Sequence, residues 1–277
     1  MGTLYVVATP IGNLGDMSPR GIEVLRNVSL IAAEDTRRSA TLLRAYDIST
    51  PMISYHQHNL RSREGRLLRA LAEGDVALIS DAGTPGIADP GREIVVAARE
   101  AGFPIVPIAG PSSLAAAVSA SGLVEGPFLF LGFLPRAGEE RRAQLGKAVA
   151  IGYPLVIFES PVRLAETLSD LERVTGNREA MVARELSKLH EELVSGSLAD
   201  LKDRFAGSEP RGEIVIVVGA ADESDAVEID VRAVIRNLLT QGMKPSRVAR
   251  EAAALTDIAG SDVYALVREI QAEIAKV

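Results

Sequence analysis

The most informative stretch of this 277-residue sequence is Ser80-Asp81-Ala82-Gly83-Thr84-Pro85-Gly86-Ile87-Ala88-Asp89-Pro90-Gly91. It follows the strand-like run Val76–Ile79 and precedes the helix-like run Glu93–Ala101. Its three glycines and two prolines fix an unusual backbone path. Open α/β sheets place their ligands at the carboxyl ends of strands, which is where this loop lies. On the pattern alone, both a ligand-binding loop and a rigid surface turn are consistent with it.

The glycine spacing differs from the two common nucleotide-binding signatures. The loop is not Gly-x-Gly-x-x-Gly, and Gly-x-x-x-x-Gly-Lys-Ser/Thr occurs nowhere in the chain. The loop is therefore not a standard dinucleotide or nucleoside-triphosphate site.

Composition excludes several other kinds of site. The chain has no cysteine, which excludes disulfides, thiolate metal sites and cysteine nucleophiles. Its three histidines are His56, His58 and His190. A chelate from His56 and His58 would require a strand, and such a pair is more often polar surface, so we expect no metal. Aromatic residues make up 4% and tryptophan is absent, so we expect no aromatic platform for stacking bases.

The net charge of −7 argues against a protein that coats RNA or DNA by charge alone, although it allows a local basic patch. No apolar run approaches the ~20 residues of a membrane span. The N-terminus enters a strand-like run without a charged leader region. We therefore expect no signal peptide, no membrane association and a cytoplasmic location.

Strand-like and helix-like runs alternate along the first half of the chain, which predicts an α/β fold with a mostly parallel sheet covered by helices. The strands are expected at Leu4–Ala8, Leu30–Ala33, Val76–Ser80, Ile105–Ile108 and Phe128–Phe133. The helices are expected at Pro19–Arg26, Arg37–Tyr46, Arg61–Glu73, Arg92–Ala101 and Ser112–Ser121.

A second α/β block and a helical tail follow. The second block has strands at Pro154–Phe158 and Glu213–Gly219, a strand pair at 181–184 and 190–194, and helices at Pro161–Val174 and Ser197–Phe205. After an acidic, linker-like stretch come three short helices, 231–241, 246–255 and 261–277, with helix-turn-helix spacing. We expect domains at 1–125 and 126–220 and a helical tail at 228–277, with 126–138 as the link between the domains.

Three further loops follow expected strands, namely Thr9–Leu14, Glu34–Arg38 and Ala109–Ser113. Loops at the carboxyl ends of parallel strands emerge at one rim of the sheet. Each loop by itself reads as an ordinary turn between strand and helix. Four together favour one shared site that holds its ligand mainly through backbone groups.

The strongest charged cluster is Glu34-Asp35 with Arg37-Arg38. In one interpretation Asp35 caps a helix and the arginines are solvated. In the other, the arginines hold a phosphate or carboxylate while Asp35 accepts a hydrogen bond or a proton. His56, Asn59 and Arg61 follow another strand end, where they either line the same rim or form a polar loop.

Six segments, in this order and at this spacing, resemble one family: Thr9–Leu14, Ala33–Arg37, Ser80–Gly91, Ala109–Ser112, Arg184–Lys188 and Pro210–Ile214. It is the family of bacterial 16S ribosomal RNA ribose 2′-O-methyltransferases that modify a decoding-site cytidine, within the tetrapyrrole (corrin/porphyrin) methylase superfamily. The resemblance covers nearly the whole chain. It implies two α/β/α domains of the tetrapyrrole-methylase type with a small C-terminal helical tail. It also implies S-adenosylmethionine in the cleft between the domains, a homodimer, and 16S ribosomal RNA of the small subunit as partner.

The resemblance also implies roles for individual residues. It suggests cofactor contacts at Ile11, Asp81, Thr84, Ile87, Ser112, Ser113, Phe158, Leu186 and Gly212. A base would assist attack by a ribose hydroxyl, which is a weak acid, and the candidates are Asp35, His56 and Glu185. Arg37 and Arg38 would bind substrate phosphates, with Asn59 and Arg61 beside them. No metal is needed.

Two other functions fit parts of the sequence. A methylase of a tetrapyrrole or another small acidic metabolite would share the fold and the cofactor loops. A non-catalytic regulator would use the tail to bind nucleic acid, but the tail mixes acidic with basic residues and is a weak electrostatic footprint for that role.

Overall fold

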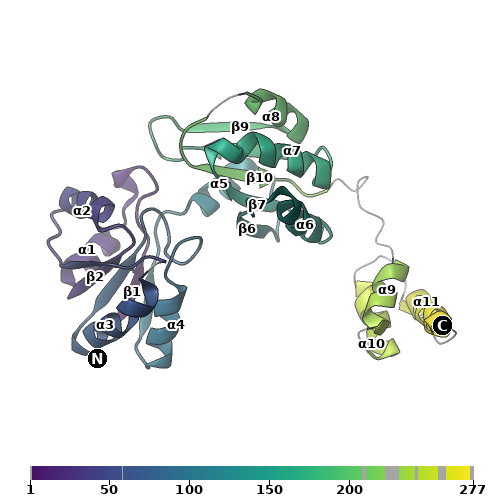
Figure 1. Cartoon of the computed structure of the whole chain (residues 1–277), viewed down its shortest axis with the longest axis horizontal. Coiled ribbons are helices and arrows are strands. Elements are labelled where there is room, and N and C mark those ends of the chain that lie inside the picture. Colours follow the sequence, from purple (N-terminus) through teal and green to yellow (C-terminus); the bar gives the residue numbers. More distant parts are fainter. Residues whose placement is uncertain are drawn as a thin grey trace. The chain divides into compact units, whose positions relative to one another are not determined.

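The computed structural model describes residues 2–57, 59–207, 210–221, 231–240, 243–254 and 260–274. The chain divides into two compact units, Met1–Ala221 and Asp222–Val277. The first unit contains two sheets, and the second contains helices (Figure 1). Within the described residues, no helix has the length and apolar character needed to cross a membrane.

The first sheet is fully parallel, as its alternating pattern predicts. Its five strands are ordered β3-β2-β4-β1-β5. They are β1 Leu4–Val7, β2 Leu30–Ala33, β3 Met52–Ser54, β4 Val76–Ile79 and β5 Ile105–Ile108. Four of them lie within one residue of the predicted runs, whereas β3 was expected only as an unnamed strand end before His56.

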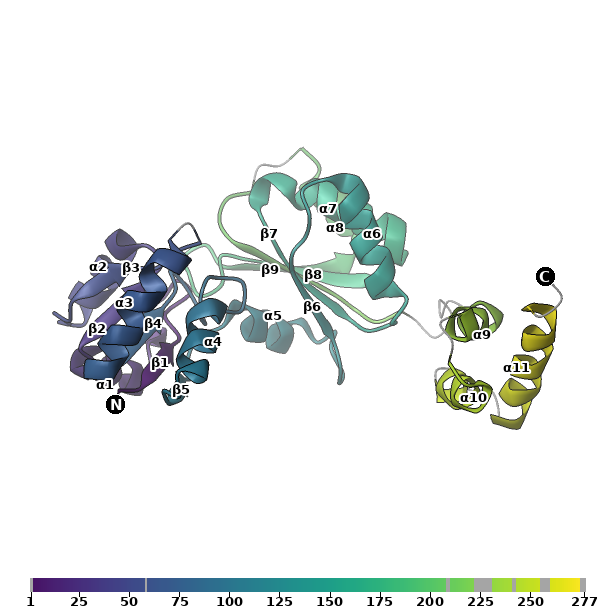
Figure 2. The same cartoon turned by 60° about the horizontal axis from the view of Figure 1, so that its bottom comes forward.

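Helices cover both faces of this sheet because successive strand residues point to opposite sides. Ile31 and Ala33 pack toward α1 (Pro19–Asn27) and α2 (Thr36–Ala45). Ala32 and Leu78 pack toward α3 (Leu60–Glu73) and α4 (Arg92–Glu100). Figure 2 shows α3 and α4 together in front of these strands. The unbroken apolar strands therefore fit a doubly covered sheet.

The second sheet is mixed, in contrast to the first sheet, for which the alternating pattern predicts a parallel arrangement. Its order is β6-β7-β10-β8-β9, and β6 with β7 is the parallel pair. A short connection joins β8 to β9 as a hairpin, which forces an antiparallel pair. The strands are β6 Leu129–Phe133, β7 Leu155–Glu159, β8 Glu179–Arg184, β9 Glu192–Ser197 and β10 Ile214–Val218.

The segment expected as a link, 126–138, contains β6 and so contributes an edge strand to the second sheet. One face of this sheet carries α6 (Gly138–Val149), α7 (Leu164–Thr175) and α8 (Leu198–Phe205). The other face carries α5 (Ser113–Ser121), whose Ala117 is buried against Met181 and Val215 (Figure 2). A helix that precedes the second sheet in the chain thus helps form its core.

Arg141 on α6 is fully buried within the second half. Its guanidinium lies 2.6 Å from Asp170 and 2.6 Å from Glu166, both on α7. A buried charge requires such partners because its desolvation is costly. Arg141 therefore ties α6 to α7 and takes no part in the rim.

The second unit is a bundle of α9 (Val231–Thr240), α10 (Pro245–Ala254) and α11 (Gly260–Ile274). Its buried core includes Ile235, Val248, Val263 and Val267. The three predicted tail helices are present.

Candidate functional site

The four predicted loops follow β1, β2, β4 and β5, which are neighbours in the first sheet. They emerge at the carboxyl ends of these strands and border a cavity of about 410 Å³. The lining includes Ile11 from the first loop, Glu34 and Arg38 from the second, and Ser112 and Ser113 from the fourth. The second sheet supplies the opposite wall. One site thus joins both halves of the first unit, as the convergence of the loops predicts.

The glycine- and proline-rich loop is held by Thr9. The Thr9 backbone forms a two-way bridge with Gly83, with N···O distances of 2.8 Å and 3.0 Å. The buried Thr9 hydroxyl lies 3.3 Å from the carbonyl oxygen of Ser80. Gly83 and Gly86 both have φ of 80°, a conformation in which a side chain is strained. The glycines therefore allow the backbone of the loop to turn, and the hydrogen bonds of Thr9 hold the loop in that conformation.

The cavity lining contains every residue expected to contact a cofactor. The first half contributes Ile11, Asp81, Thr84, Ile87, Ser112 and Ser113, and the second half contributes Phe158, Leu186 and Gly212. Of the expected substrate and base residues whose side chains the structure describes, Arg38 alone lines the cavity.

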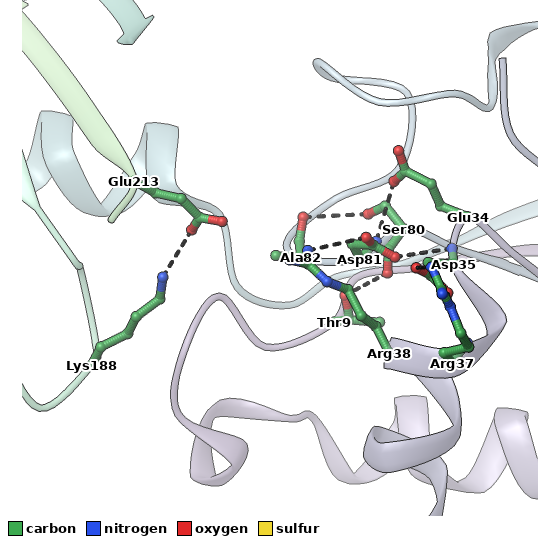
Figure 3. Close-up of polar contacts among 10 residues, drawn as sticks. All are labelled: Thr9, Glu34, Asp35, Arg37, Arg38, Ser80, Asp81, Ala82, Lys188 and Glu213. Carbon is green, nitrogen blue, oxygen red and sulfur yellow. Dashed lines mark hydrogen bonds and ion pairs between the residues drawn. The ribbon is translucent and has the colours of Figure 1, made fainter. Parts of the chain in front are cut away.

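Asp81 is the centre of the charged cluster at the rim (Figure 3). Its carboxylate accepts the Asp35 backbone N–H at 3.0 Å and lies 3.2 Å from an Arg38 nitrogen. Its own backbone N–H points to a Glu34 carboxylate oxygen at 3.4 Å. Asp81 thus links the glycine- and proline-rich loop to the start of α2.

Asp35 caps α2, in agreement with the capping interpretation. Its carboxylate accepts the Arg37 backbone N–H at 2.8 Å and forms an ion pair with the Arg37 guanidinium at 3.0 Å. These bonds from Arg37 lower the pKa of Asp35 to about 2. A carboxylate with so low a pKa is a poor proton acceptor. The structure therefore does not support Asp35 as a base. The Arg37 side chain is 90% exposed in spite of this ion pair.

Glu185 is also held by a cation. Its carboxylate lies 2.7 Å from the ammonium of Lys188, which lowers the pKa of Glu185. Lys188 reaches Glu213 as well, at 3.2 Å (Figure 3). The neighbouring Ser187 hydroxyl accepts the Asn13 backbone N–H at 3.1 Å, so this turn is tied to the first loop. Glu185 thus has a structural partner and lies outside the cavity lining.

His56 and Asn59 do not line the cavity. The Asn59 side chain accepts the His56 backbone N–H at 2.9 Å and donates to the Ser54 carbonyl oxygen at 3.2 Å. Asn59 thereby closes the turn between β3 and α3, which matches the polar-loop interpretation. His58 and the side chain of Arg61 lie outside the described part of the chain.

Several lining residues were not selected as site residues, and Glu34, Asp89 and Phe133 are the three most informative of them. Glu34 and Asp89 both lie within segments that the sequence singled out, but Asp35 and Asp81 were chosen instead. Phe133 is 59% exposed at the end of β6 and packs its ring edge-on against Phe158, with centroids 5.7 Å apart. An aromatic run in a strand normally indicates core, so only the register of β6 identifies Phe133 as a lining residue.

The two missed carboxyl groups share one electrostatic property. Burial raises the pKa of Glu34, and the nearby Asp89 carboxylate raises it further. Burial also raises the pKa of Asp89, against a hydrogen bond from Ser80. Within the described residues, no group of three or more histidine, aspartate or glutamate side chains is placed to hold a metal ion.

Known proteins resemble this chain in sequence. The family model of the tetrapyrrole (corrin/porphyrin) methylases matches residues 3–202. A ribosomal RNA small subunit methyltransferase I from Synechocystis is 42% identical over 99% of this chain and 100% of its own length. A protein of the same name from Xylella fastidiosa is 43% identical over 95% of this chain and 98% of its own length.

A solved structure resembles the fold. The uroporphyrin-III C-methyltransferase from Thermus thermophilus, complexed with S-adenosyl homocysteine, superposes with a TM-score of 0.58. It is 19% identical in sequence and covers 79% of this chain and 97% of its own length. At this identity the likeness concerns the fold alone.

Gly212 provides a test of how closely the cavity wall is packed. Its φ is 94°, and a Cβ there would lie 2.0 Å from Oε1 and 2.4 Å from Cγ of Glu185. The whole Glu185 side chain would have to leave Lys188. We expect Gly212→Ala to lower the free energy of unfolding by about 1–3 kcal/mol more than the same substitution at a glycine of similar φ without a clash, because added atoms in a packed wall force their neighbours to move. Urea unfolding of the purified variants measures this difference.

Gly152→Ala is the matched control, because Gly152 has φ of 79° and a Cβ added there would have no other atom within 4 Å. It shares the backbone strain and lacks the collision. Equal losses of stability in the two variants would show that the contact with Glu185 is unimportant.

Proposed function

We propose that this chain methylates the ribose 2′-hydroxyl of a cytidine in 16S ribosomal RNA. It belongs to the tetrapyrrole (corrin/porphyrin) methylases and, among them, to the ribosomal RNA small subunit methyltransferases I. The methyl donor is S-adenosylmethionine. The proposal is carried by one observation, the single cavity that gathers the loops of the first sheet and the wall of the second. At the edge of this cavity, the exposed side chains of Arg37 and Arg38 at the start of α2 form the surface proposed to bind RNA.

The lining fits the donor in shape and in charge. Ile11, Phe158 and Leu186 offer apolar surface of the kind that ligand pockets use, and the glycine at 83 brings backbone close to the cavity. The carboxylates of Asp81 and Asp89 favour a positive charge. When bound, S-adenosylmethionine supplies an electrophilic methyl group on a cationic sulfonium. The residues that would hold it are Ile11, Asp81, Thr84, Ile87, Ser112, Ser113, Phe158, Leu186 and Gly212.

Arg37 and Arg38 supply the contacts to RNA in this proposal. Their side chains are 90% and 70% exposed, and both stand in the first turn of α2. Each is positioned by one carboxylate, Asp35 for Arg37 and Asp81 for Arg38. A pre-positioned guanidinium binds phosphate oxygens in the same planar geometry that it uses for carboxylates.

The other two functions have weaker support. The tetrapyrrole methylase likeness in structure concerns the fold, whereas the likeness to ribosomal RNA methyltransferases extends over nearly the whole chain. A non-catalytic regulator that binds nucleic acid through the tail would leave the cavity of the first unit unused, and in the described part of the tail three arginines are paired with carboxylates. Arg232 and Arg236 pair with Glu269 and Glu273, and Arg247 pairs with Glu251. We further propose a homodimer in the cytoplasm, on the basis of the resemblance.

The proposed function is tested with small ribosomal subunits from bacterial cells that lack this chain. Incubation with donor carrying a labelled methyl group is expected to place the label on one ribose of 16S RNA, located by mass spectrometry of RNA fragments. Uroporphyrinogen-type tetrapyrroles serve as the competing substrate. Label on the tetrapyrrole and none on RNA would refute the proposal.

Arg37→Ala separates the RNA contacts from the donor site. Because Arg37 is outside the cavity lining, its loss is expected to weaken RNA binding and leave donor affinity unchanged. Removal of one phosphate contact lowers the salt dependence of RNA binding by about one unit of slope. Filter binding at several salt concentrations and calorimetry with the donor measure the two affinities. Arg20→Ala, on the exposed surface of α1, is the control, and equal loss of both affinities would contradict the separation.

We propose that the tail docks the RNA substrate. It folds around its own buried core, separate from the unit that carries the cavity. A chain ending at Gly219 is therefore expected to bind the donor normally and to methylate ribosomal subunits poorly. Calorimetry and the labelling assay measure the two properties. Unchanged turnover on subunits would argue against a docking role.

A further inference from the structure

We propose that Glu34 accepts the proton of the attacking ribose hydroxyl. This inference rests on the proposed function and deepens it, because it assigns the base that the methyl transfer uses. The carboxylate directly follows β2 and lines the donor cavity, and its contact with Asp81 links it to the start of α2, which carries Arg37 and Arg38 (Figure 3). A ribose hydroxyl that enters this cavity can therefore reach Glu34 while the arginines hold neighbouring phosphates.

The first argument is elimination among the carboxylates that line the cavity. Three of the five are held by cations within 4 Å, since Asp81 pairs with Arg38, Glu159 with Arg163, and Glu213 with Lys188. Glu159 is also fully buried and accepts the Thr167 hydroxyl at 2.6 Å. Among the described residues, Glu34 and Asp89 form no ion pair, and these two remain as candidates.

The second argument distinguishes Glu34 from Asp89. Asp89 lies in the glycine- and proline-rich loop, beside the expected donor contacts Thr84 and Ile87. Glu34 instead directly precedes the helix start that carries Arg37 and Arg38, on the side of the site proposed for RNA. Glu34 receives only a long bond, 3.4 Å from the Asp81 backbone N–H to its Oε2. Within the described part of the chain, its other oxygen has no hydrogen bond to protein. A carboxylate with one uncommitted oxygen that faces a cavity is placed to receive a proton from a ligand.

The third argument is the charge around Glu34. The groups that face it are Asp89 and Asp81 from the loop after β4, and Arg38 from α2. The two carboxylates and burial raise the pKa of Glu34, while the guanidinium and the Asp81 N–H lower it. The net direction is upward, which strengthens Glu34 as a proton acceptor. The three base candidates chosen from the sequence lack this combination of exposure to the cavity and freedom from a cation.

The proposed step balances as follows. The ribose O–H bond breaks and its proton moves to the Glu34 carboxylate, which becomes a neutral carboxylic acid. The oxygen electron pair forms a bond to the methyl carbon. The C–S bond breaks, and its electron pair stays on sulfur, which becomes a neutral thioether. Glu34 then returns the proton to solvent.

Glu34→Gln tests the assignment, because it keeps the size of the side chain and removes the basic oxygen. We expect the single-turnover rate on ribosomal subunits to fall about 100-fold or more, since general bases contribute about 10²–10⁴. Donor affinity and KM for the subunits should change little. The wild-type rate should rise with pH as Glu34 ionises and then level off. In Glu34→Gln this acidic limb should disappear.

Glu34→Asp and Glu23→Gln complete the design. The Glu34→Asp variant keeps a carboxylate on a side chain that is one methylene shorter. Its rate should exceed that of Glu34→Gln and should again rise with pH in the acidic range. Glu23 is an exposed residue of α1, so its glutamine variant controls for the substitution itself. Calorimetry with the donor and thermal unfolding verify that each variant is folded.

The outcomes separate this inference from the proposed function. A wild-type rate and an unchanged pH profile in Glu34→Gln would overturn the assignment of Glu34 while leaving the methylation of RNA intact. A loss of donor binding equal to the loss of rate would also overturn it, because Glu34 would then hold the donor. Absence of RNA methylation by the wild-type chain would refute both proposals.

Discussion

The backbone bridge between Thr9 and Gly83 is the interaction on which the site depends. It joins the loop after β1 to the loop after β4 by two hydrogen bonds, and the buried Thr9 hydroxyl adds contacts to the same loop. Loops normally differ in mobility from the strands that carry them. Here the bridge extends the order of the sheet beyond its edge. The side chains at Asp81 and Thr84 are therefore presented to the cavity from a fixed backbone.

Much of the fold can be predicted from the sequence because its signals are local. The alternation of apolar runs and helical periodicity identifies β2 and β5 to the residue, and Ser18 before Pro19 marks the start of α1 with a side-chain cap. The mixed order of the second sheet is less accessible, because it follows from which strands pair rather than from their composition. The burial of Arg141 is hidden for the same reason, since its partners lie on another helix.

The residues that line the cavity can also be predicted from the sequence in part. Turn-forming residues identify the four loops, and the resemblance selects nine residues that the structure brings to one cavity. The base is harder to choose, since Glu34 and Asp35 are neighbours with nearly the same chemistry. Only the three-dimensional partners separate them. Arg37 binds Asp35 and lowers its pKa, while Glu34 faces other carboxylates. The sequence shows that Glu34 and Asp35 are adjacent, but only their contacts in the folded chain show which carboxylate is the better proton acceptor.

The placement of α5 has a consequence for how ligands come and go. By chain order this helix extends the first half, yet its Ala117 is buried in the apolar core under the second sheet. The core around Ala117 consists of α5, the residues after it and the second sheet, so by its packing α5 belongs to the second half. The segment between β5 and α5, which lines the cavity at Ser112, therefore joins the two halves. A change in the angle between the halves would move this segment and alter the access of small molecules to the cavity.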